Sequence, residues 1–327
     1  MATFHRYVVE PFPSLSCDSL ISMGASGIVH TVDSSIALKS PKAYTVEMDD
    51  KDPRKEIELR RAREEEKESR REITREKAFF EILDREPHPH IIQSFFFAPE
   101  GIFMHRLQCN LELRLSPERR DNPIICRKTE IQWIKGIASG AAWLEKKGFA
   151  HGDIRPGNIL LDDQENVKLC DFDCMVKMKE GLIAFNTLFL KPKEEIATSQ
   201  TDLFAIASTA YNIITRNPLF HPLDLWNDDD YEEIERRLAA SEFPPTNDLF
   251  CGFLIRKCWT DGYKSVADLA EEAKQIYDCT SCNETDHSHV NPQVLGENEV
   301  KTGEENTEAT AGAERWASAL IKLSRGR

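Results

Sequence analysis

The sequence of 327 residues predicts an α+β protein that begins with strands and becomes richer in helix toward residue 279. Three observations support this fold class. Residues Phe4–Lys42 mix short apolar runs with Gly, Ser and Pro, as strands joined by turns do. Residues Asp49–Glu86 are dense in Arg, Lys and Glu and contain no Gly. Residues Pro87–Cys279 alternate apolar runs with apolar residues at helical spacing.

The stretch Asp49–Glu86 predicts one long, mostly solvated helix. Its apolar residues are sparse and gather near its end. We therefore expect the last turns to face inward. These apolar residues are Ile57, Ile73, Phe79, Phe80 and Leu83.

The following region predicts both strands and helices. The run Phe95–Phe97 is interpreted as part of a core strand. Strands are expected within Ile91–Phe97, Gly101–Leu107, Asn158–Leu161 and Val167–Cys170, and helices at Ile131–Leu144, Asp202–Thr215, Tyr231–Leu238 and Val266–Tyr277.

The end of the chain changes composition. Residues 280–313 have few large apolar side chains and many Glu, Asn, Thr and Gly, which predicts a disordered acidic tail. Residues 314–327 carry Trp316, Leu320 and Leu323 at helical spacing. They predict either a short amphipathic helix or a frayed terminus.

Composition and charge argue against several classes of function. The net charge of −14 argues against a sequence-independent grip on nucleic acid. There is no apolar run of about 18 residues and no signal-like start, so we expect a soluble intracellular protein, cytoplasmic or nuclear, without a membrane partner. Nine scattered Cys favour free thiols in a reducing compartment.

A turn-rich stretch, Ser22–Val29, holds Gly24 and Gly27 between two apolar segments. Such glycines let backbone N–H groups approach a phosphate, although a plain hairpin turn has the same composition. Lys39 ends the next apolar strand, from which its ammonium group could reach beneath the turn.

A second motif runs from His151 to Leu161. It holds Asp153 and Asn158 on a loop with Pro156, followed by a strand, and Asp171 stands at the end of a later strand. One carboxylate can accept a proton from a substrate hydroxyl, while the Asn oxygen and the second carboxylate suit Mg²⁺ bound to phosphates.

These motifs resemble the eukaryotic-type protein kinase family, over roughly Tyr7–Tyr277. The resemblance implies a kinase-like domain over residues 1–279 with a bilobal fold. A small β-rich N-terminal lobe with one long helix (about 1–107) would join a larger, mainly α-helical C-terminal lobe (about 108–279), with Mg·ATP in the cleft. Residues 49–75 would be a charged helical extension that the family usually lacks.

The resemblance also implies site roles. Asp153 would orient the attacking hydroxyl and accept its proton, and Arg155 would reach the γ-phosphate. Glu76 is expected to pair with Lys39, with Glu72 and Glu81 as competitors. Catalytic roles fall to Asp153, Lys39, Arg155 and Asn158, metal binding to Asn158 and Asp171, and nucleotide binding to Ser22, Gly24, Gly27, Val29, Ala37, Lys39, Glu76, Met104, His105, Leu107 and Asp171.

The chain also departs from the family pattern. Gly152 replaces the Arg of H-R-D, which would clamp an activation-loop phosphate, so we expect activity without that phosphorylation. Asp173 replaces the Gly of D-F-G. The A-P-E motif is reduced to a stretch near Leu190–Pro192, and Tyr263 or Lys264 stands where its Arg partner is expected.

Three functions are therefore open. The first is a protein kinase that uses ATP and Mg²⁺ on Ser or Thr hydroxyls of a protein substrate. The second is a nucleotide-binding pseudokinase or scaffold, suggested by Gly152, Asp173 and Ser22. The third is a small-molecule kinase of the aminoglycoside or choline type, suggested by His151-Gly152-Asp153. The oligomeric state stays open.

Overall fold

The computed structural model describes residues 5–8, 15, 17–24, 26–49, 51–117, 124–184 and 186–283. The chain divides into two units, Met1–Asn283 and Glu284–Arg327. The second unit lies outside the described residues, together with the predicted acidic tail from residue 284 onward and the predicted helix at 314–327.

An antiparallel sheet of five strands forms the first part of the described unit, in the order β2-β3-β4-β7-β6. The turn between β3 and β4 is closed by Asp33, whose Oδ1 accepts the N–H groups of Ser35 and Ile36 at 2.7 and 2.8 Å. All of β4 is buried, because it lies between two other strands. The strands are β2 (Leu20–Met23), β3 (Ile28–Thr31), β4 (Ile36–Ser40), β6 (Ser94–Ala98) and β7 (Gly101–His105).

The interpretation of Phe95–Phe97 as a core strand is wrong in one respect. These residues do form a strand, β6, but β6 lies at the edge of the sheet. Phe95 and Phe96 are 39% and 40% exposed, while Phe97 packs against the core. A register shift between Ser94 and Phe96 breaks the strict alternation of faces, so two consecutive rings reach solvent.

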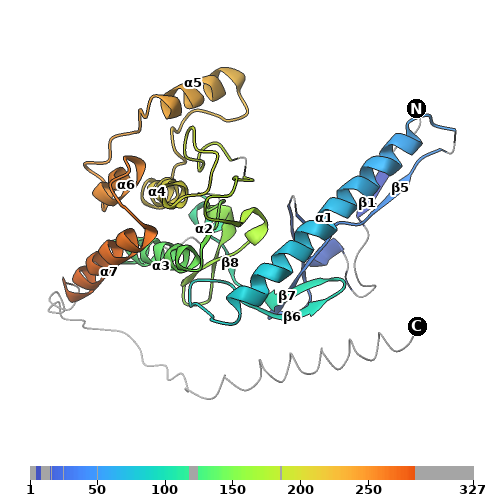
Figure 1. Ribbon diagram of the computed structural model, residues 1–327, viewed down its shortest axis with the longest axis horizontal. Coiled ribbons are helices and arrows are strands. Elements are labelled where there is room, and N and C mark those ends of the chain that lie inside the picture. The colour runs from blue at the N-terminus through green and yellow to red at the C-terminus, as the bar shows by residue number, and fades with distance from the viewer. Residues whose placement is uncertain are drawn as a thin grey trace, which may run out of the picture. The chain divides into compact units, whose positions relative to one another are not determined.

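Helix α1 (Lys55–Leu83) is the predicted long charged helix. In Figure 1 its N-terminal end runs beside the antiparallel pair of β1 (His5–Val8) and β5 (Tyr44–Glu47), and its other end reaches β7. Its buried residues follow the helical period and therefore make one inward face. They are Ala62, Ser69, Ile73, Glu76, Phe80 and Leu83.

Polar contacts attach the N-terminal half of α1 to the backbone of the preceding segments. The Ser69 hydroxyl accepts the Lys42 N–H at 2.9 Å and donates to the Ser26 carbonyl at 2.6 Å. The Glu66 carboxylate accepts the Tyr44 N–H at 2.7 Å. These bonds satisfy backbone groups beside β5 and hold a segment of α1 that has little apolar surface to bury.

Helices dominate the second part of the described unit. Helix α3 packs against α4 and α7, and α4 packs against α6. Helix α7 ends at Asn283, six residues beyond the predicted helix end at Tyr277, so it includes residues 280–283 of the predicted disordered tail. The helices are α2 (Leu111–Leu115), α3 (Arg127–Lys146), α4 (Ser199–Thr215), α5 (Asp228–Ala239), α6 (Gly252–Trp259) and α7 (Val266–Asn283).

Short antiparallel pairs connect these helices to the sheet-containing part. β10 (Ile159–Leu161) lies between β8 (Cys109–Asn110) and β11 (Val167–Leu169), and β9 (Phe149–Ala150) pairs with β12 (Val176–Lys177). The predicted α+β class, with a β-rich beginning and a mainly helical continuation, is confirmed. Within the described residues, no helix combines the length and apolar character that a bilayer crossing requires.

Candidate active site

A cavity of about 630 Å³ lies between β2, β3 and β4 on one side and β10 and β11 on the other. One part of its wall is apolar, and Lys39, Glu76, Asn158 and Asp171 line another part. Asp153 and Arg155 are not among the lining residues. The sequence-predicted residues that line the cavity are Ser22, Gly24, Gly27, Val29, Ala37, Lys39, Glu76, Met104, His105, Leu107, Asn158 and Asp171.

Lys39 lies between two carboxylates that come from distant parts of the chain. Its Nζ is 2.7 Å from Glu76 Oε2 on α1 and 2.5 Å from Asp171 Oδ1 after β11. Burial alone would lower the pKa of Lys39, but the two negative charges outweigh it and hold that pKa above its ordinary value. The ammonium group is therefore kept charged inside the cavity.

Glu76 is the partner of Lys39 because α1 buries it, at 1% exposure, whereas Glu72 is half-buried and Glu81 is exposed. Burial raises the pKa of Glu76, and the nearby charge of Lys39 opposes that rise. Asp171 behaves differently: burial would raise its pKa, but Lys39 lowers it below the usual value. Lys39 is therefore the group that opposes the effect of burial on both carboxylates.

The loop that follows β9 gathers three predicted residues around one carboxylate. Asn158 Nδ2 donates to Asp153 Oδ2 at 2.7 Å and to the Asp153 carbonyl at 3.0 Å. Arg155 Nε donates to the same Oδ2 at 3.0 Å. Because both donors meet Oδ2, they orient the Asp153 carboxylate and leave Oδ1 without a hydrogen bond from either of them.

Asp202, in the first turn of α4, fixes the same loop through hydrogen bonds to its backbone. Its fully buried carboxylate accepts the N–H groups of His151 and Gly152 at 2.9 and 3.1 Å. Burial raises the pKa of Asp202, against the two N–H donors and the nearby His151. Since both bonds go to the backbone, Asp202 fixes the loop whatever side chain stands at position 152.

Gly152 has a conformational role that the motif alone did not reveal. Its φ is +79°, and a Cβ added there would lie 2.6 Å from the carbonyl oxygen of Cys174. Residues with a side chain rarely adopt this backbone conformation. The space that a side chain of the H-R-D Arg would enter is thus occupied by the backbone that follows Asp171.

The segment that begins at Asp171 is ordered by aromatic contacts. Asp171 has φ 64°, and Phe172–Cys174 form a single 3-10 turn. The buried Phe172 ring packs edge-on against Phe80 of α1 at 5.5 Å and against His151 at 5.5 Å between ring centroids. A column of rings therefore connects α1 to the loop that carries Asp153.

Two further contacts hold the segment after Asp171. Arg75 Nη2 donates to the Met175 carbonyl at 2.6 Å. Lys191, in the reduced A-P-E stretch, forms an ion pair with Asp261. Tyr263, which with Lys264 stands where the Arg partner of A-P-E is expected, donates to Glu272 at 2.7 Å.

Comparison with known proteins agrees with this geometry. Residues 42–287 match the family described as Protein kinase domain, which is about three quarters of the chain. The chain belongs to the protein kinase domain family. The match begins after Lys39, but the structure brings Lys39 and the Ser22–Gly27 turn into the same cavity as Asp171.

Several kinases are similar to parts of this kinase domain. Aurora kinase of Debaryomyces hansenii is 28% identical over 173 residues, 49% of this chain and 39% of the relative. The carbon catabolite-derepressing protein kinase of Secale cereale is 32% identical over 126 residues, 37% and 24% of the two chains. Serine/threonine-protein kinase mos of Gallus gallus is 29% identical over 91 residues, 24% and 26%. The chain spans less than half the length of each of these relatives.

Arg75 and Glu112 are among the residues of this kinase-domain site that sequence reasoning missed. Arg75 lies one residue before Glu76, in a stretch so rich in charge that no pattern marks it. Glu112 lines the cavity from α2, and its carboxylate adds to the charges that raise the pKa of Arg155 against the effect of burial. The sequence does carry a signal for α2, the helix that contains Glu112. Asn110 is the N-cap of this helix, and its Oδ1 accepts the Leu113 N–H at 2.8 Å.

Proposed function

We propose that this protein is a serine/threonine protein kinase that transfers the γ-phosphoryl group of Mg·ATP to a hydroxyl of a protein substrate. One observation carries the proposal. Asn158, which lines the cavity with Lys39 and Asp171, also donates to the carboxylate of Asp153 at 2.7 Å. A phosphate-and-metal set and a proton acceptor are thereby joined in one loop.

The cavity suits ATP in its chemistry. Val29, Ala37, Met104 and Leu107 offer apolar contacts to a purine ring. The turn with Gly24 and Gly27 lines the same cavity as Lys39, whose ammonium charge favours phosphate oxygens. The cavity, at about 630 Å³, is within the usual range for a small-molecule site.

The residues for a magnesium ion are Asn158 and Asp171. Asn158 uses its Nδ2 on Asp153, which leaves its Oδ1 as the atom for a metal, and the Asp171 carboxylate offers a second oxygen. Mg²⁺ bound there would neutralise charge on the phosphate oxygens.

In the proposed step, the substrate hydroxyl oxygen forms a bond to the γ-phosphorus, and the bond between that phosphorus and the β,γ-bridging oxygen breaks. ADP leaves, and the hydroxyl proton passes to the Asp153 carboxylate. Arg155 and Asn158 hold this carboxylate in one orientation. Lys39 offsets negative charge on the phosphates.

The test compares Asp153→Asn with Asp163→Asn, a matched change at an exposed aspartate in the turn between β10 and β11. We expect transfer of labelled γ-phosphate from Mg·ATP to peptides to fall at least about 100-fold in Asp153→Asn, because general base catalysis is lost. Asp163→Asn should stay within about twofold of the wild type.

The assay gives a different result for each alternative function. Saturable Mg·ATP binding with no transfer by the wild type would favour a nucleotide-binding scaffold. Label on small alcohols or aminoglycosides alone would favour a small-molecule kinase. Equal rates in Asp153→Asn and the wild type would remove Asp153 from the proposed chemistry.

A further inference from the structure

The outward side of α1 carries a row of cations that the proposed phosphoryl transfer does not use. We call Arg63, Lys67, Arg70, Arg71 and Arg75 the basic face. Arg63, Lys67, Arg71 and Arg75 recur every four residues, and Arg70 stands three residues after Lys67. The row therefore follows one broad side of the helix, with Arg70 and Arg75 at its two edges. Together with Glu66, Thr74 and Ala78 they line a shallow hollow of about 810 Å³ on the surface.

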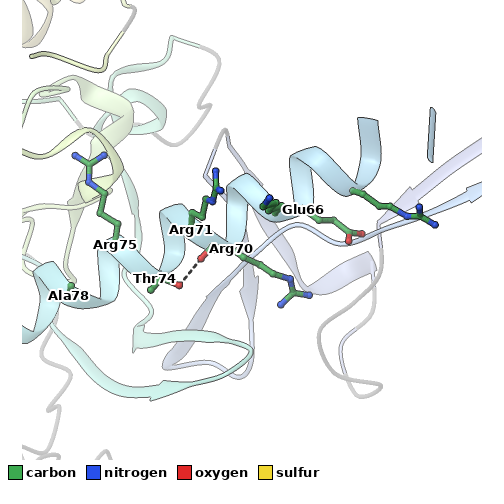
Figure 2. Close-up of a pocket in the computed structure, with 8 residues that line it drawn as sticks. Glu66, Arg70, Arg71, Thr74, Arg75 and Ala78 are labelled. Atoms are coloured by element: carbon green, nitrogen blue, oxygen red, sulfur yellow. Dashed lines mark hydrogen bonds between the residues drawn. The ribbon is translucent and has the colours of Figure 1, made fainter. Parts of the chain in front are cut away.

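The hollow has cationic walls and a floor of small side chains. Figure 2 shows Arg71 and Arg75 projecting on one side of α1 and Arg70 on the other, with Thr74 between Arg75 and Arg70 along the helix and Ala78 beyond Arg75. The Thr74 hydroxyl donates to the Arg70 carbonyl at 2.7 Å and so turns toward the helix. The floor therefore leaves room for side chains of a ligand between the arginines.

Some charges of this hollow already have partners. The Glu66 carboxylate accepts the Tyr44 N–H, and Arg71 pairs with Glu68 at 3.0 Å in a bridge whose two side chains are about 60% exposed. Such an exposed pair holds Arg71 only weakly. Arg75 donates to the Met175 carbonyl.

Three cations of the basic face are exposed and have no acidic partner within ion-pair distance among the described residues. They are Arg63, Lys67 and Arg70. Glu66 is the acid that lines the hollow, whereas Glu64, Glu68 and Glu72 are not among its lining residues. Cations therefore outnumber acids five to one around the hollow.

We propose that the basic face of α1 binds a short acidic segment of a partner protein. Guanidinium groups bind carboxylates through paired hydrogen bonds, and four of the five cations are Arg. The rise of a helix makes the distance from Arg63 to Ala78 roughly 22 Å. An extended peptide covers that distance with roughly seven residues.

The charge of the whole molecule selects against longer anions. With a net charge of −14, the protein as a whole repels a nucleic acid or an anionic membrane. The same repulsion acts on an acidic peptide, but it is smaller because a short peptide carries fewer charges. Charge complementarity over roughly two nanometres thus favours an acidic protein segment as the occupant.

The test is a binding titration of the full chain without ATP, so its result does not depend on phosphoryl transfer. The probe is a fluorescein-labelled peptide of about ten alternating Glu and Ser residues, followed by fluorescence anisotropy. The test variant combines Arg63→Gln, Lys67→Gln and Arg70→Gln. The matched control combines Lys146→Gln, Arg256→Gln and Lys264→Gln, which removes the same charge from exposed positions on other helices or loops.

We expect saturable binding that weakens about tenfold in the test variant and less than twofold in the control variant. Circular dichroism should show that both variants remain folded. Absence of binding to the wild type, or equal weakening in both variants, would overturn the proposal. Tighter binding of heparin or of phosphatidylserine vesicles, lost in the same test variant, would overturn it in favour of a polyanion-binding surface.

Discussion

Gly152 and Asp153 illustrate how single residues set the chemistry of this site. Gly152 adopts φ +79°, and the Cys174 carbonyl oxygen lies close to the position that a Cβ would occupy. The Gly152 N–H donates to Asp202. Asp153 then meets its two donors, Arg155 and Asn158. The glycine that departs from H-R-D is thus part of the packing between the loop and the segment after Asp171, and we expect restoring a side chain to disturb both.

Gly152→Ala tests this packing, with Gly148→Ala as the matched control. Both glycines have positive φ, at +79° and +85°, but a Cβ at Gly148 meets no atom within 4 Å. The two variants share the backbone cost of about 1–2 kcal/mol. We expect Gly152→Ala to lose about 2 kcal/mol more unfolding free energy than Gly148→Ala, because of the contact with Cys174. Urea denaturation measures this, and equal losses would contradict it.

Among the elements, α1 makes the most contacts with functional groups. Consecutive turns of its C-terminal half supply Arg75 to the Met175 carbonyl, Glu76 to Lys39 and Phe80 to the Phe172 ring. The basic face crosses the middle of the helix, and Glu66 attaches the N-terminal half to β5. One helix therefore contacts both Lys39 and the segment after Asp171, without the Arg that Gly152 replaces.

We expect this arrangement to make activity independent of phosphorylation in the segment after Asp171. Phosphatase treatment should leave peptide phosphorylation within about twofold. Arg75→Ala should lower it several-fold, because a charge-assisted hydrogen bond of about 1.5–3 kcal/mol is lost. Arg85→Ala, at an exposed position just after α1, serves as the control. A sharp loss after phosphatase treatment would show that a phosphate supplies the missing clamp.

At the scale of the whole described unit, two histidines join its sheet-containing and helical parts. His88 Nδ1 accepts the His90 N–H at 3.2 Å, and its Nε2 is 3.3 Å from the Ser139 hydroxyl on α3. His90 Nδ1 is 3.0 Å from the Val167 carbonyl. Burial, with repulsion from His90 and Lys168, lowers the pKa of His88 to about 4. The fold therefore favours the neutral imidazole of His88.

Stability should consequently fall in weak acid. The unfolded chain takes up a proton on His88 near its ordinary pKa of about 6.5, while the folded chain resists it until about 4. The stabilisation is thus complete above pH 6.5 and is lost as the pH falls toward 4. We expect the free energy of unfolding to be about 1 kcal/mol lower at pH 5 than at pH 7, after allowing for partial exposure.

His88→Asn is the variant for this prediction. The Asn side chain can accept the N–H two residues ahead but does not titrate. The difference between pH 5 and pH 7 should shrink in His88→Asn and stay unchanged in His221→Asn, an exposed histidine. A pH dependence that is the same in all three proteins would contradict the role of His88.

The fold class and most of the site could be predicted because their signals are local. Lys39 ends an apolar strand, Asp153 and Asn158 share one loop, and α1 contains no Gly. Contacts between distant segments could not be predicted in the same way. The bond from Arg75 to Met175 spans 100 residues, and the pairing of Lys191 with Asp261 spans 70. Neither Met175 nor Asp261 stands in a sequence pattern that marks it as a partner.

The sequence pattern also could not show which strand lies at the edge of the sheet or which backbone conformation Gly152 adopts. The three rings of Phe95–Phe97 indicated a core strand, but the order of strands in the sheet decides which strand is covered. The left-handed backbone at Gly152 depends on the Cys174 carbonyl, which only the folded chain brings there.

Identification of the phosphorylated group tests the central claim most directly. Full-length protein is incubated with γ-labelled Mg·ATP and a mixture of peptides, and the labelled product is hydrolysed to identify its phosphoamino acid. The proposed function predicts phosphoserine or phosphothreonine with the wild type and almost none with Asp153→Asn. Label on no peptide hydroxyl, or equal label with both proteins, would contradict it.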